Sequence, residues 1–136
     1  MPSKNVAERF GVKPGFVVQE FGYDEDVDFD VRDDIEAVIG GVLEDEDYRG
    51  VADMVIGWWR SDDGDVDDLA DFLVDCAASL DAGGGVIWCL VPAQGLDYHV
   101  PTSDVSEAAH TAGQSATTTL SISPQWQAIR VTAHGY

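Results

Sequence analysis

The stretch VADMVIGWWRSDDGDVDDLADFLVDCAASLDAGGGVIWCLVP, residues Val51–Pro92, decides the fold. It contains two short apolar runs, Met54–Trp59 and Val86–Val91, which are rich in β-branched and aromatic residues and therefore predict fully buried strands. Between them, over about Asp65–Asp81, apolar residues recur at helical spacing among aspartates. A strand, a helix and a second strand of these lengths predict a right-handed parallel crossover.

Upstream of this unit the sequence predicts a further strand and a further helix. The apolar run Phe16–Phe21 predicts a central parallel strand. The helix begins at Asp28 or Asp30, either of which is a good N-cap, and ends at Gly40-Gly41. Val42-Leu43 is a candidate for a short edge strand. The apolar stripe of this helix consists of Val31, Ile35, Val38, Ile39 and Val42.

Downstream of the crossover, the sequence predicts a helix over about Ser103–Ala112 and two antiparallel strands, Ala116–Ile122 and Ala128–Ala133. Residues 1–12 form a polar lead with a short helical turn, and residues 13–136 form one domain. The elements together predict a single-domain α/β fold of three layers: helices on both faces of a mostly parallel, Rossmann-like sheet that ends in an antiparallel hairpin.

Buried and exposed positions follow from the same pattern. Trp58 and Trp59 are adjacent on one strand, so they face opposite sides of the sheet, and a core position is favoured over an interaction anchor for both. Trp126, in the predicted hairpin turn, is the better candidate for exposure. Cys76 and Cys89 lie among apolar neighbours, which predicts buried free thiols. The N-terminus lacks the apolar core of a signal peptide, so we expect a cytoplasmic location, where a disulfide is poorly motivated. No run reaches the length of a membrane span.

The charge is strongly negative. The 136 residues contain 26 acids and 7 bases, a formal net charge of −19, and most of the acids lie between Glu20 and Asp81. Such a field repels nucleic acid and anionic membranes and favours basic partners. A solvated face adapted to a salty cytoplasm is the alternative reading of the same acids.

Several uncommon segments occur together in one order and cover about Phe10 to Val131. They are KPGFVVQEFGYDEDVD, DVRDDIEAVIGGVLEDEDY, VIGWWR, GGVIWCLVP, HVPTSD and TAGQSATTTLSISPQWQAIRV. This combination resembles DUF3052, an actinobacterial family of small acidic proteins of unknown function, and the resemblance implies no activity. A more distant similarity, to the later half of class I S-adenosylmethionine-dependent methyltransferases, implies a trimmed methyltransferase-like sheet.

The chemistry of a methyltransferase is not complete in these residues. A cofactor site of that kind needs a glycine-rich turn after the first strand and an acid at the end of the second. The turn Glu20–Asp24 has one glycine, and the second strand is missing or reduced to Val42-Leu43. The aspartate runs lack the glycine and glutamate of a calcium loop, and the histidines lack ligand spacing. The sequence therefore predicts no catalytic residue, metal or cofactor, and an enzyme is disfavoured.

Three loops follow the carboxyl ends of the predicted parallel strands, where α/β sheets bind ligands: Gly22–Asp28, Arg60–Asp65 and Pro92–Pro101. We expect this edge to be the working surface of a non-catalytic binding or regulatory domain with a basic protein partner. The alternatives are an enzyme or sensor that binds S-adenosylmethionine or a nucleotide there, and an acidic mimic of nucleic acid. The candidate residues are Gly22, Tyr23, Asp24, Arg60, Asp62, Gln94, Tyr98 and His99.

Overall fold

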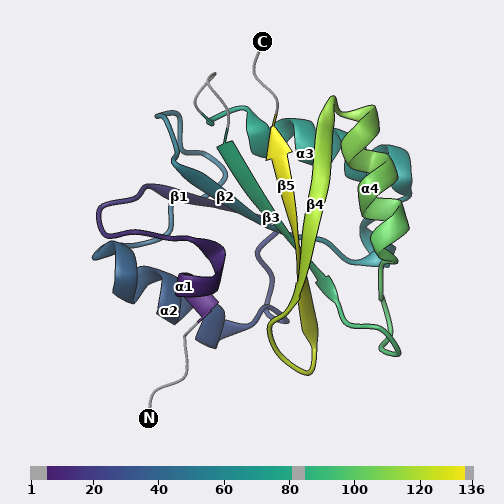
Figure 1. Cartoon of the computed structure of the whole chain (residues 1–136), viewed down its shortest axis with the longest axis horizontal. Helices are drawn as coiled ribbons and strands as arrows, with labels where there is room; N and C mark the ends of the chain where they lie inside the picture. Colours follow the sequence, from purple (N-terminus) through teal and green to yellow (C-terminus); the bar gives the residue numbers. More distant parts are fainter. Residues whose placement is uncertain (1–5, 81–84, 134–136) are drawn as a thin grey trace.

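The computed structural model describes residues 6–80 and 85–133, and it forms a five-stranded sheet with helices on both faces (Figure 1). The strands are β1 (Val18–Phe21), β2 (Met54–Trp58), β3 (Gly85–Pro92), β4 (Gln114–Ser121) and β5 (Trp126–Ala133). The helices are α1 (Val6–Phe10), α2 (Phe29–Ile39), α3 (Val66–Ala77) and α4 (Thr102–Thr111), with a 3₁₀ turn at Ser61–Asp63. The predicted helix end at Asp81 and the glycines Gly83 and Gly84 lie outside the described residues.

The sheet confirms the predicted crossover and hairpin. The strand order is β1-β2-β3-β5-β4. β1, β2 and β3 run parallel, with Met54 opposite Val86, and α3 connects β2 to β3. β5 inserts between β3 and β4 and is antiparallel to both. The three-layer, Rossmann-like architecture follows, with one antiparallel edge.

Two hydrophobic cores lie on opposite faces of the sheet because successive strand residues point to opposite sides. Trp59, Leu73 and Ile87 belong to the core beneath α3 and α4. Trp58 and Ile35 belong to the core beneath α1 and α2. Trp58 is fully buried and Trp59 is 8% exposed, so the core assignment of both tryptophans is confirmed. Cys76 and Cys89 are buried free thiols, also as predicted.

Helix ends follow their capping residues. Asp28 caps α2, and its carboxylate accepts hydrogen bonds from the backbone N–H groups of Asp30 and Val31. Gly40, at φ +76°, ends the same helix in the left-handed conformation that glycine adopts easily. The chain therefore leaves the helical path before Val42, which is 71% exposed rather than part of the predicted apolar stripe.

β1 corrects a prediction: it is the outer strand of the five, not a central one. Val18–Phe21 are nevertheless buried, because the segment after α2 covers the free edge of the strand. Glu44 forms a single parallel bridge with Gln19, and the side-chain amide of Gln19 donates to the carbonyl groups of Asp45 and Tyr48. The predicted edge strand at Val42-Leu43 is thus reduced to one bridge at Glu44.

Trp126 is a second correction, since it is 5% exposed and not a surface residue. β5 begins at Trp126, two residues earlier than predicted, and the ring points into the core beneath α1 and α2 rather than out of a turn. It packs edge-on against Trp58 with ring centroids 4.8 Å apart, and its indole N–H donates to the carbonyl of Asp26.

The predicted N-terminal lead contains α1, which packs into the hydrophobic core that also holds Trp58 and Ile35. Phe10 is 4% exposed and stacks on Trp88 with ring centroids 4.6 Å apart. The indole N–H of Trp88 donates to the carbonyl of Phe10 at 3.1 Å. The lead is therefore held to the sheet from Ala7 onward, and Val12 is also buried.

Candidate functional site

The three loops that follow β1, β2 and β3 meet at the carboxyl edge of the sheet. Arg60 donates from Nη1 to the carbonyl oxygen of Gly22 at 2.7 Å, which joins the first loop to the second. The backbone N–H of Ser61 donates to the carbonyl of Tyr98 at 3.0 Å, which joins the second loop to the third. The sequence places these loops together because β1, β2 and β3 are parallel neighbours.

Arg60 is the centre of this edge, but it is committed to the protein itself. The residue is 7% exposed, and Nε and Nη2 form a bidentate pair with the carboxylate of Asp26. Its backbone N–H donates to Asp63 at 2.9 Å, and its guanidinium lies over the ring of Trp126. Burial acts to lower the pKa of the guanidinium, but the hydrogen bond and charge of Asp26 outweigh burial and raise this pKa overall. Arg60 therefore holds the loops together and has few hydrogen-bond donors left for a ligand.

The backbone conformation and the close packing at position 22 both require glycine. Its φ is +75°, and a Cβ atom at this position would lie 2.2 Å from the carbonyl oxygen of Trp58. Its backbone N–H donates to the carboxylate of Glu46 at 2.9 Å. Both backbone polar groups of the one glycine in the turn are therefore bonded within the protein, the carbonyl to Arg60 and the N–H to Glu46.

A second ionic group lies on the outer side of β1, next to the loop edge. Glu20 is 5% exposed, and its carboxylate accepts two hydrogen bonds from Arg32, at 2.8 and 3.0 Å, and one from the indole of Trp58 at 2.9 Å. The hydrogen bond from Arg32 to Glu20 raises the pKa of the guanidinium despite the opposing effect of burial. Arg32 also lies over the ring of Tyr23, 4.9 Å from its centroid. A buried carboxylate with this many donors is a structural anchor.

The other predicted site residues are exposed to solvent, except His99, which is bonded within its own loop. Asp24, Asp62 and Gln94 are exposed, and Tyr23 and Tyr98 are 51% and 55% exposed. Tyr98 has φ +67°, an uncommon conformation for a side chain of this size. His99 is half-buried, and its Nδ1 donates to the carbonyl of Pro92 at 2.8 Å. The structure thus brings the predicted residues to one edge but gives them different roles.

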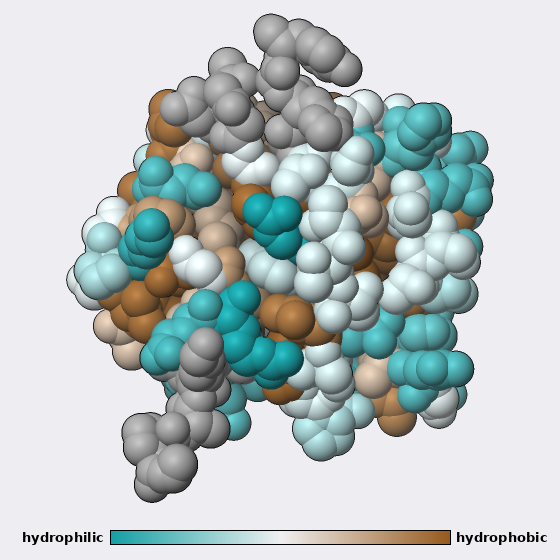
Figure 2. Space-filling model, viewed as in Figure 1, coloured by the Kyte–Doolittle hydropathy of each residue, from teal (hydrophilic) through white to brown (hydrophobic). Residues whose placement is uncertain are grey.

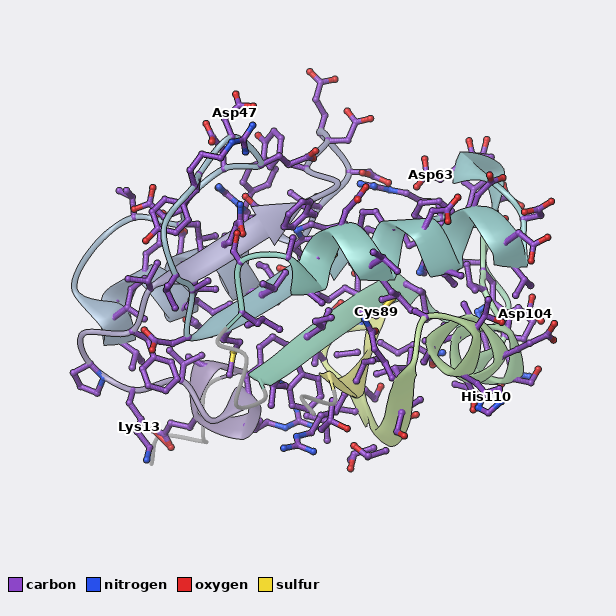
Figure 3. All side chains as sticks on the ribbon, turned by 90° about the horizontal axis from the view of Figure 1, so that it is seen from above. Lys13, Asp47, Asp63, Cys89, Asp104 and His110 are labelled. Atoms are coloured by element: carbon purple, nitrogen blue, oxygen red, sulfur yellow. The ribbon has the colours of Figure 1, made fainter. Side chains whose placement is uncertain are left out.

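A small cavity of about 220 Å³ lies at this edge between the starts of α3 and α4. Trp59 and Leu69 line it on the apolar side, and Asp65 and Asp104 line it on the polar side. Figure 3 shows Asp63 and Asp104 at the same end of the molecule. The cavity is smaller than the ~300–1,000 Å³ that is usual for sites of drug-sized ligands.

Asp26 and Glu46 are the site residues that the sequence analysis missed. Each lies in an acidic run, so nothing distinguishes it from its exposed neighbours. Glu20 and Arg32 carry a readable signal, because an acid inside the apolar run FVVQEF must be paired if that strand is buried. Over residues 6–80 and 85–133, no cluster of histidine, cysteine and acidic side chains has the arrangement of a metal site.

The sheet order and its antiparallel edge place this fold with the methyltransferases. A methyltransferase of Pyrococcus furiosus superposes with a TM-score of 0.58 at 13% identity, over 96% of this chain and 81% of that one. Magnesium protoporphyrin IX methyltransferase of Synechocystis PCC 6803, solved with bound S-adenosylmethionine, gives 0.57 at 12% identity, over 94% and 74%. At these identities the likeness concerns the fold alone.

The family is defined by the sequence. The model of DUF3052, described as a protein of unknown function, matches residues 7–135, and the chain belongs to this family. Uncharacterized proteins of Mycobacterium tuberculosis H37Rv and Mycobacterium bovis are 41% identical over 129 residues, which cover 95% of this chain and 78% of theirs. None of the helices described here has the length and apolar character needed to cross a membrane.

Proposed function

We propose that this protein is a non-catalytic binding or regulatory domain of the cytoplasm, and that its acidic loop edge binds a basic protein partner. The observation that carries the proposal is the combination of exposed carboxylates with exposed aromatic side chains on the same three loops. On these loops Tyr23 and Tyr98 are each about half exposed and Leu96 is 44% exposed, and Phe29, the first residue of α2, is 47% exposed beside them. The buried free thiols of Cys76 and Cys89 fit a reducing compartment.

Charge supports a basic partner. Among the described residues, the ion pairs at this edge join Arg60 to Asp26 and Asp63, and none of the described ion pairs includes Asp24, Asp62 or Asp97. These three exposed carboxylates therefore present negative charge that the edge itself does not neutralise. Tyrosine is enriched at protein interfaces because it combines a large apolar surface with a polar end.

The hydrogen bonds of Gly22 argue against retained cofactor binding. In a dinucleotide-type turn, glycine lets the backbone approach a ligand. Here Glu46 accepts from the N–H of Gly22, and Arg60 donates to its carbonyl oxygen. The alternative, a domain that binds S-adenosylmethionine as an enzyme or sensor, is favoured by the fold shared with the cofactor-bound Synechocystis methyltransferase.

Capture from native lysate tests the partner proposal. The edge variant is Asp24→Asn, Asp62→Asn, Asp97→Asn. Its matched control is Asp33→Asn, Asp71→Asn, Glu107→Gln, which removes the same charge from exposed positions away from the three loops. We expect the wild type and the control to recover the same basic protein at low salt, and the edge variant to lose it. Equal recovery by the edge and control variants would overturn the role of this edge.

Thermal denaturation with S-adenosylmethionine tests the alternative. A ligand that binds only the folded protein stabilises it by about 1.4 kcal/mol at ten times its Kd. Because both backbone groups of Gly22 are already bonded, we expect no saturable change in Tm at millimolar concentration. A saturable rise in Tm that the unreactive analogue S-adenosylhomocysteine reproduces would favour the cofactor-binding alternative.

A further inference from the structure

A second cavity, of about 500 Å³, lies at the opposite end of the sheet, at the amino ends of the parallel strands. It exists because α1 has only five residues and covers β3 but not the neighbouring faces of β5 and β4. In Figure 1, α1 and α2 lie beside β5 and β4 and leave the front of this hairpin without a helix. Figure 2, from the same side, shows strongly hydrophilic side chains next to brown, hydrophobic ones on this face.

Aromatic and basic side chains line this cavity together. Its aromatic residues are Phe16, which is half-buried, and Phe10 and Trp88, which are 4% and 3% exposed. Its basic residues are Arg9, Lys13 and Arg130. Figure 3 shows Lys13 far from Asp63 and Asp104, which mark the acidic loop edge.

The concentration of cations here is unusual for a chain that has 7 bases and a net charge of −19. Among the described residues, ion pairs hold Arg32 and Arg60, whereas Arg9, Lys13 and Arg130 enter none of the described ion pairs. Arg130 donates to the hydroxyl of Thr117 at 3.3 Å, a neutral acceptor, and a guanidinium has five donors.

The basic residues that line the cavity outnumber its acidic residues by three to two. Glu8 and Asp53 are lining residues, and a carboxylate oxygen of Asp53 accepts a hydrogen bond from the backbone N–H of Val17 at 2.7 Å. Three cations against two acids give the cavity a local charge opposite to that of the whole molecule. Apolar surface beside basic groups that none of the described ion pairs neutralises matches a ligand that is apolar at one end and anionic at the other.

We propose that this cavity is a binding site for a small amphipathic organic anion, with an aromatic or aliphatic body against the partly exposed Phe16, Val86 and Leu120 and an acidic group near Arg130 and Lys13. Its volume lies within the ~300–1,000 Å³ of ordinary small-molecule sites. The proposal is independent of the acidic loop edge, because the two surfaces share no residues.

Calorimetric titration with naphthalene-1-sulfonate tests the site, with the uncharged 1-naphthalenemethanol as the matched probe. We expect the sulfonate to bind one to one and the alcohol to bind at least about tenfold more weakly, because the alcohol lacks the negative charge that strengthens hydrogen bonds from the basic side chains. The variants Arg130→Gln and Lys13→Gln should each weaken sulfonate binding by about tenfold. The control Arg49→Gln removes a cation outside the cavity and should leave the affinity unchanged.

The opposite results overturn the proposal. They are no sulfonate binding, equal affinity for the two probes, or equal weakening by Arg49→Gln and Arg130→Gln. Sedimentation of the protein without probe gives a further arm: self-association that Arg130→Gln abolishes would show that the acidic surface of a second copy, rather than a small anion, occupies the cavity. Thermal melts of each variant identify any loss of affinity that reflects misfolding.

Discussion

Gly22 sets the geometry of the carboxyl edge at the scale of a single residue. Its positive φ turns the chain back over β2, and its missing side chain lets the turn lie against the backbone of Trp58. Arg60 and Glu46 then hold the two backbone polar groups of the glycine. Both the conformation and the packing at this position therefore depend on glycine.

The variant Gly22→Ala should lose about 3 kcal/mol or more of unfolding free energy. The left-handed conformation alone costs a non-glycine residue about 1–2 kcal/mol, and the added Cβ would also lie 2.2 Å from the Trp58 carbonyl oxygen. The matched control is Gly40→Ala, which has φ +76° but nothing within 4 Å of the new atom. In urea denaturation, Gly22→Ala should lose more unfolding free energy than Gly40→Ala, and the difference is the cost of the clash. Equal losses in the two variants would show that the turn at Gly22 relaxes freely.

At the scale of elements, α3 shows why the central crossover is readable from the sequence. Asp65 and Asp68 form a reciprocal capping box: each carboxylate accepts the backbone N–H of the other residue at 3.0 Å. Leu69, Leu73 and Cys76 are buried on one side of the helix. The start of the helix and the face that it buries can thus both be predicted from the spacing of nearby residues in the sequence.

The variant Asp65→Ala should lose about 1 kcal/mol of unfolding free energy, the usual cost of removing an N-cap. Asp65→Asn keeps an acceptor and should lose much less. Asp71→Ala, on the exposed middle of the same helix, should be neutral or slightly stabilising because alanine has the higher helix propensity. Thermal denaturation of the three variants checks the order, and a loss for Asp71→Ala equal to that for Asp65→Ala would contradict the capping argument.

The elements that the sequence did not place correctly depend on contacts between distant segments. The runs in β2 and β3 predict buried strands by composition alone, and the structure pairs them as expected. The outer position of β1 could not be predicted, because segment 44–48 covers its edge through Gln19 without forming a strand. Trp126 is buried against Trp58, and Asp26, a hundred residues away in sequence, accepts its indole N–H.

The candidate site, like the fold, could be predicted from the sequence only in part. The meeting of the three loops at one edge follows from the parallel direction of β1, β2 and β3, which the sequence predicted, although it did not predict the outer place of β1. The role of Arg60 did not follow, because its partners Asp26 and the Gly22 carbonyl come from another loop. Position in an acidic run also gave no indication that Glu46 would bond the N–H of Gly22. Local pattern therefore located the edge, and only tertiary contact showed which of its residues are free.

At the scale of the whole molecule, charge is divided between two ends. Exposed carboxylates crowd the loops at the carboxyl edge, and Arg9, Lys13 and Arg130 gather at the other end. With a net charge of −19, repulsion among the acids opposes compaction of the chain. The stability of the fold should therefore depend on how strongly the solvent screens these charges.

The Tm should rise by several degrees between about 0.01 M and about 1 M NaCl, because the Debye length falls from about 30 Å to about 3 Å over that range. For a domain of this size, 1 kcal/mol corresponds to roughly 3–5 °C. KCl should have the same effect if screening is the cause, whereas an ion-specific site would separate the two salts. The edge variant Asp24→Asn, Asp62→Asn, Asp97→Asn should have a higher Tm than the wild type at low salt and a smaller salt dependence, since it lacks three of the repelling charges. A Tm that stays constant or falls with added salt would mean that the acids are already neutralised within the fold, and it would remove the electrostatic basis for a basic partner at the loop edge.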